Sequence, residues 1–74
     1  MDEIDSLMQE MVQQQREKLL LLAREIVPCA TPDDILQPND FPELEHHPFF
    51  RYEEGILHGL LAAQAALFAL EKEL

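Results

Sequence analysis

The sequence has few of the residues that small proteins use for cross-links or catalysis. Cys29 is the only cysteine among 74 residues, so no disulfide can form within the chain. Both glycines lie in an apolar segment, which argues against a glycine-rich phosphate-binding loop. Ser6 and Thr31 are the only Ser or Thr residues, and neither belongs to a nucleophile motif. We therefore predict that the chain is not an enzyme and has no cofactor.

Basic side chains are also scarce, with five Lys and Arg against fifteen Asp and Glu, for a net charge of −10. Such a balance disfavours binding to nucleic acids and to anionic membranes, because both need Lys and Arg. Residues 33–54 carry seven acids and one base, and so hold most of the negative charge. A basic protein surface is the electrostatic partner that would fit, although the acids would also keep an assembly soluble.

A membrane span is not expected. The segment from Gly55 to Leu70 is apolar except for His58 and Gln64. It is shorter than the about 20 apolar residues that cross a bilayer. The N-terminal sequence lacks the features of a secretory signal, and a single thiol fits a reducing compartment. We therefore predict a cytoplasmic protein.

A first helix is predicted over residues 2–27, which contain no Gly or Pro and many good helix formers. Its apolar residues recur at steps of three and four, which indicates a single apolar row. Gln15 interrupts this row at its middle, and Pro28 ends the helix. The row consists of Ile4, Met8, Met11, Val12, Leu19, Leu22 and Ile26.

All five prolines lie within residues 28–48, which we interpret as an ordered connection rather than a long helix. Thr31 followed by Pro32 and Asp34 is typical of a helix start, and predicts a short helical turn near 32–36. Phe41-Pro42 indicates a second, weaker start. A second helix is predicted over residues 49–73, with His47 or a neighbour as its cap.

The second helix is apolar nearly all round, so it must be buried on several sides. One apolar row has heptad spacing, with a neighbouring row at Leu57, Leu61 and Phe68. A third row contains small residues at Gly55, Gly59, Ala62, Ala66 and Ala69, and predicts a close helix contact. The heptad row consists of Phe49, Ile56, Leu60, Ala63, Leu67, Leu70 and Leu74.

These patterns predict an all-α fold with a single domain over residues 1–74. Two helices of similar length form an antiparallel hairpin, and two hairpins form a four-helix bundle that can cover the second helix. The expected homodimer or larger homo-oligomer interface consists of Ile56, Gly59, Leu60, Ala63, Leu67 and Leu70. An obligate subunit that folds on a different protein is the alternative.

A cluster of acids and histidines raises an alternative function of a different class. In this alternative, the chain is a di-metal protein whose site is assembled at a subunit interface. The residue types suit zinc or iron. However, Glu54 and His58 are four residues apart, whereas di-iron bundles use Glu-x-x-His. His46 and His47 precede Pro48, and their side chains should diverge. We therefore favour solvated side chains and helix starts over a metal site.

The aromatic residues gather in the connection and at the start of the second helix. They either close this end of the hairpin or form an exposed patch with an acidic rim, which is typical of protein-binding hot spots. The candidate partner-binding residues are Asp40, Phe41, Glu43, Glu45, Phe49, Phe50 and Tyr52.

The sequence therefore predicts a protein-interaction module, such as an adaptor, co-chaperone or regulator. In size, acidity and two-helix plan the chain resembles the small hairpin co-chaperones of bacterial type III secretion, although no motif carries this likeness.

Overall fold

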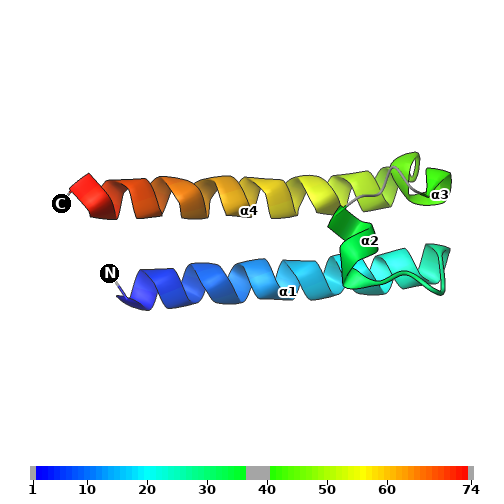
Figure 1. Ribbon diagram of the computed structural model, residues 1–74, viewed down its shortest axis with the longest axis horizontal. Helices are drawn as coiled ribbons and strands as arrows, with labels where there is room; N and C mark the ends of the chain where they lie inside the picture. The colour runs from blue at the N-terminus through cyan, green and yellow to red at the C-terminus, as the bar shows by residue number, and fades with distance from the viewer. Residues whose placement is uncertain (1, 37–40, 74) are drawn as a thin grey trace.

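The computed structural model describes residues 2–36 and 41–73, which form four helices (Figure 1). These are α1 (Asp2–Ile26), α2 (Pro32–Leu36), α3 (Pro42–Glu45) and α4 (Pro48–Glu73). No strand occurs in the described residues, so the predicted all-α class is confirmed. The observed bounds of both long helices and of α2 lie within one residue of the predicted ones.

The two long helices lie side by side in opposite directions, and both chain ends are at the same end of the hairpin (Figure 1). The short helices α2 and α3 lie at the other end, which we call the connection end. The molecule measures 44 × 18 × 17 Å. None of the helices in the described ranges is long and apolar enough to cross a membrane.

Local hydrogen bonds explain where the helices of the connection begin. The backbone N–H of Thr31 donates to Asp34 Oδ2 at 2.8 Å, as expected at the start of α2. At the start of α4, the backbone N–H of Phe50 donates to His47 Nδ1 at 3.3 Å. Pro32 and Pro48 each occupy a first helical position, where a missing N–H has little cost. Both starts agree with the sequence prediction.

The core lies between the long helices and beneath the short ones. Leu19 and Ala23 of α1, Leu44 of α3 and Phe50 of α4 are fully or almost fully buried. Ile35 anchors α2 against this core, so the connection is ordered by apolar contacts where the structure describes it. The other buried apolar side chains are Val12, Val27, Ala30 and Leu57.

This core is restricted to the connection half of the hairpin. On α1 no side chain of residues 3–11 is buried, and on α4 none of residues 58–73 is buried. Leu7 is 55% exposed and Leu70 is 48% exposed, although both are large and apolar. We call this part of the hairpin, towards the chain ends, the open half.

The apolar row predicted for the first helix is in fact divided between two directions. Val12 and Leu19 point into the core, whereas Ile4 and Met11 are exposed on a flank of α1. On α4, Leu57 is buried, whereas Phe68 of the same row is 46% exposed and Ile56 of the heptad row is 38% exposed. Leu60 and Leu61, one from each row, are half-buried against the core, so the helix pair covers each row of α4 only in part.

Matched substitutions in α1 would test the position of the core. Leu19→Ala should destabilise the protein by about 2–5 kcal/mol, because it removes buried methyl groups and leaves a cavity. Leu21 is two residues away and 64% exposed, so Leu21→Ala should change stability by at most about 0.5 kcal/mol. Urea unfolding followed by circular dichroism would measure both, and equal losses would contradict this core.

Candidate functional site

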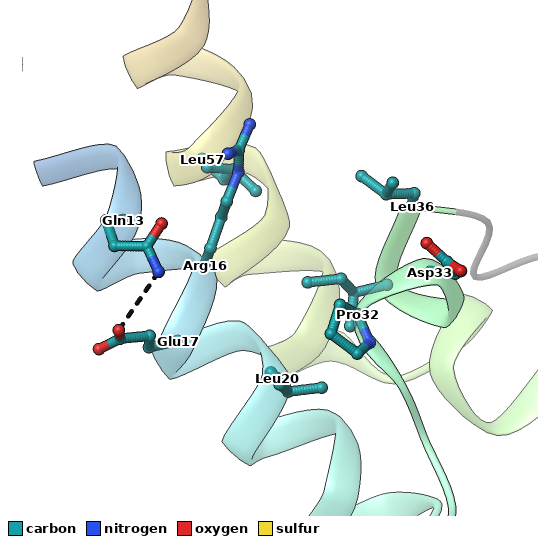
Figure 2. A pocket seen from close by; sticks show the side chains of 9 residues that line it. Gln13, Arg16, Glu17, Leu20, Pro32, Asp33, Leu36 and Leu57 are labelled. Atoms are coloured by element: carbon teal, nitrogen blue, oxygen red, sulfur yellow. Dashed lines mark hydrogen bonds between the residues drawn. The ribbon is translucent and has the colours of Figure 1, made fainter. Parts of the chain in front are cut away.

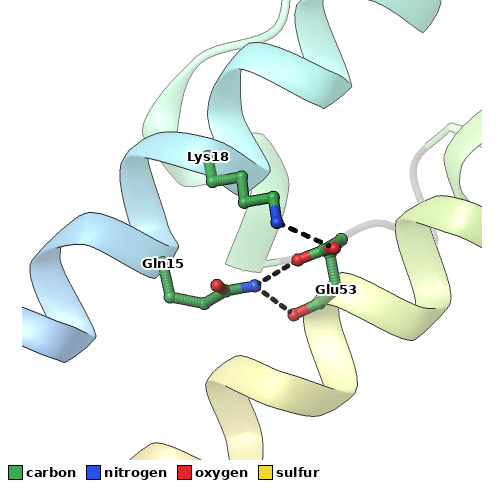
Figure 3. Close-up of polar contacts among 3 residues, drawn as sticks. All are labelled: Gln15, Lys18 and Glu53. Atoms are coloured by element: carbon green, nitrogen blue, oxygen red, sulfur yellow. Dashed lines mark hydrogen bonds and ion pairs between the residues drawn. The ribbon is translucent and has the colours of Figure 1, made fainter.

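A polar cluster lies in the interface between the long helices (Figure 3). The side-chain amide of Gln15 donates to the backbone oxygen of Glu53 at 2.9 Å and to Glu53 Oε2 at 2.7 Å. Lys18 Nζ lies 3.2 Å from Glu53 Oε1. Gln15 is buried, and its amide can meet both acceptors at only one position along α4, so this cluster fixes the register of the two helices.

The cluster also changes the acidity of Glu53. The hydrogen bond from Gln15 and the nearby ammonium of Lys18 lower the pKa of Glu53, because both stabilise its charged form. Desolvation acts in the opposite direction and raises the pKa, but its effect is smaller than that of the Gln15 hydrogen bond. With its charge partnered in this way, Glu53 links α4 to α1 through Gln15 and Lys18.

The candidate metal ligands, which the sequence analysis disfavoured, are not brought together. The carboxylate of Glu54 is buried and lies 3.0 Å from Arg51 Nη1, so it is part of an ion pair. His47 is the helix cap described above, and His46 and His58 are exposed. Within residues 2–36 and 41–73, no group of three or more His, Cys, Asp or Glu is arranged to hold a metal ion.

The aromatic side chains at the connection end divide into two sets. Phe50 is fully buried and Phe41 packs against the core, so these two close this end of the hairpin. The prediction that Phe50 binds a partner is therefore wrong, because the core already surrounds it. Phe49 and Tyr52 are 71% and 68% exposed and lie one helical turn apart on α4.

The candidate acidic residues are less uniform. Glu43 is exposed and Glu45 is half-buried on α3, so both lie at the connection end near the aromatic residues. Asp40 lies outside the described residues. Leu36 adds a large apolar side chain that is 69% exposed at the end of α2.

A pocket of about 380 Å³ lies where α2 crosses the long helices (Figure 2). Leu20, Ile35 and Leu57 form its apolar part, and Arg16 and Asp33 line it with charged groups. Gln13 Nε2 donates to Glu17 Oε1 at 3.3 Å along one edge. The pocket is about half open to solvent and its polar lining side chains are all exposed, so it lacks the convergent buried polar groups of a small-molecule site.

The opposite side of the hairpin carries several exposed or half-buried apolar side chains, and we call it the open face. A shallow groove there is lined by Met11, Ile56 and Leu60 and by the polar residues Gln14, Gln15 and Lys18. Residues three and four apart on a helix share a face, which places the flank of α1 and the heptad row of α4 on this side. Its apolar members are Ile4, Leu7, Met11, Ile56, Leu60, Ala63, Leu67 and Leu70.

The structure thus groups the predicted interface residues on one exposed or half-buried face. The close contact expected at the small residues is not made by α1, because a Cβ added at Gly55 or Gly59 would have nothing within 4 Å. Sequence analysis missed Ile4, Leu7 and Met11 as part of this face. Their spacing of three and four residues, offset from the row of Val12 and Leu19, was the available signal.

Comparisons with family models, with curated proteins and with solved structures found no significant match for this chain.

The polar cluster predicts a specific pH dependence. The pKa of Glu53 is lower in the folded protein, so its contribution to stability is present above the unfolded pKa of about 4.3. That contribution is lost as pH falls through the lowered folded pKa. Gln15→Leu should raise the pKa of Glu53 and reduce the acid-induced loss of stability. NMR titration of the Glu53 carboxyl carbon, with urea unfolding at pH 3 and pH 6, would measure both effects.

Gln13→Leu is the matched control, because Gln13 is exposed and bonds Glu17 rather than Glu53. It should leave the titration of Glu53 unchanged. An unaltered Glu53 pKa in Gln15→Leu would show that the amide is not the cause of the shift.

Proposed function

We propose that this chain is a small, acidic, non-enzymatic protein-interaction module that acts as a homo-oligomeric helical bundle. The observation that carries the proposal is the exposure of large apolar side chains on the open face. Single exposed apolar residues are ordinary, whereas a contiguous apolar face on a small protein indicates a protein-binding surface. A hairpin of this size is also close to the lower limit at which one core stabilises a fold.

The charge distribution supports a division of roles along the hairpin. The open face would mediate self-association, and the acidic connection end would remain in solvent. Glu43 there is exposed, and Leu36 adds an apolar anchor beside the acids. A basic protein surface would complement this end, since opposite charges accelerate and orient association. The exposed thiol of Cys29 fits a reducing, cytoplasmic setting.

Two alanines on α4 provide a matched test of self-association. Ala63 lies on the open face, and Ala65 is two residues away on a different side of the helix, and both are exposed in the single chain. Ala63→Glu should dissociate the oligomer, because it would bury an unpaired carboxylate in the interface. Ala65→Glu adds the same charge and should leave the oligomer intact. Sedimentation equilibrium at several concentrations would measure both.

A wild-type chain that is monomeric at micromolar concentration, fully helical and unaffected in melting by its concentration would contradict self-association. A chain that is soluble but unfolded until another protein is added would instead support the obligate hetero-complex.

Charge reversal would test the connection end separately. Asp40→Lys, Glu43→Lys and Glu45→Lys together should leave the oligomeric state and the melting temperature nearly unchanged, because Glu43 is exposed, Glu45 is only half-buried, and charges at a protein surface contribute little to stability. The triple variant should recover fewer basic proteins in pull-downs from the native host, with the largest difference at low salt. Identical recovery by both proteins would mean that the acids act only in solubility.

A further inference from the structure

The open face carries little charge on a strongly charged chain. Lys18 is the charged side chain that lines its groove, and it is paired with Glu53. The whole chain carries a net charge of −10. A basic partner would therefore find no unpaired acid on the open face, whereas a second copy of this acidic chain would meet little like charge there.

The length of the hairpin suits a stable dimer. The hairpin is 44 Å long and 18 Å wide. Stable protein interfaces bury about 800 Å² on each partner, so the dimer would use the full length of this side, from the exposed aromatic residues of α4 to Leu70. The open half also has no buried side chain of its own, so a second copy would provide the cover that the hairpin lacks.

The register of the helices places the apolar parts of α1 and α4 at the same level. Gln15 is hydrogen-bonded to Glu53, so Met8 and Leu60, each seven residues towards the chain ends, lie level with each other. Met8 is close to the middle of the apolar flank between Ile4 and Met11. Leu60 is close to the middle of the α4 row between Phe49 and Leu70. Both apolar segments are thus centred on one point along the hairpin.

Large apolar side chains lie on α4 on both sides of that centre, with Tyr52 towards the connection end and Leu70 towards the chain end. Gly59 and Ala63 lie near the middle beside the larger Ile56 and Leu60, and a Cβ at Gly59 would meet open space. In a twofold interface residue i contacts j and j contacts i, so Tyr52 of each copy would meet Leu70 of the other.

We propose that two copies of this chain pair through their open faces in an antiparallel dimer, with a twofold axis near Leu60 and Met8. This inference rests on the proposed self-association and specifies its geometry. Helix α4 packs against α4 of the second copy, with the small residues at the crossing. Helix α1 packs against α1 of the second copy near Leu7. The two connection ends then lie at opposite ends of the bundle.

The dimer explains the exposed aromatic residues of the single chain. In the antiparallel arrangement, Phe49 and Tyr52 of one copy lie over the segment near Leu67 and Leu70 of the other. The aromatic pair therefore belongs to the dimer interface and not to the site for a basic partner. That site is left with the acids of the connection and Leu36.

Disulfide trapping would test this geometry in the full chain with Cys29→Ser. One preparation carries Tyr52→Cys and a second, with a different affinity tag, carries Leu70→Cys. After mixing and mild oxidation, disulfides should join the two preparations. The two positions are about 27 Å apart along one helix, which no disulfide spans. Leu7→Cys in a third preparation should form a disulfide with its own copy across the axis.

Ala65→Cys is the control for random collision, because Ala65 is exposed but lies off the open face. It should form at least tenfold less disulfide with Tyr52→Cys than Leu70→Cys does. Sedimentation of each reduced variant would confirm that it still dimerises.

The outcomes separate this geometry from self-association itself. If the protein sediments as a dimer but Tyr52→Cys forms disulfides with itself, or Leu7→Cys forms none, the antiparallel arrangement is wrong. Self-association would still stand in that case. A monomer by sedimentation in both the wild type and the reduced variants would overturn both. Trapping of Tyr52→Cys with Leu70→Cys together with Leu7→Cys would establish the proposed dimer.

Discussion

The hydrogen bonds from Gln15 to Glu53 constrain the rest of the hairpin. A buried amide needs partners, and in an otherwise apolar row it finds them at only one point on α4. Apolar contacts alone would allow α1 and α4 to pair in several registers, because Leu and Ala side chains can pack at more than one position. The Gln15 amide selects one register, and so determines which residues of α1 and α4 lie at the same level.

That register divides the hairpin into two halves with different physical roles. In the connection half, Phe50, Leu44 and Ile35 add to the two helices enough cover for a small core. In the open half no third element is present among the described residues, and two helices can bury only the side chains between them. Several large apolar residues on the open face are left exposed to water, which is the physical basis for proposing a second chain.

The acids and the apolar face complement each other in this interpretation. A net charge of −10 would oppose association if it were spread over the contact surface. Its highest density lies instead in the connection, and the groove of the open face has Lys18 as its charged side chain. Under the proposed self-association, negative charge would keep the assembly soluble and would complement a basic partner, while the contact between copies would remain largely apolar.

The sequence by itself determined the helices, their ends and the fold class. The bounds of the helices and the cap at His47 could be predicted because they depend on local signals. These signals are the prolines, the good helix formers and the helix start at Thr31 to Asp34. The excess of apolar residues on the second helix likewise predicted an uncovered surface. Only the tertiary structure decided which row each helix buries, because Leu57 and Ile56 are equally apolar and periodicity does not distinguish two neighbouring rows. Burial of Phe50 beside exposed Phe49, the pairing of Glu53 with Gln15, and the common level of Met8 and Leu60 all depend on the rotation and register of α4 against α1, which arise from contacts between residues distant in the chain.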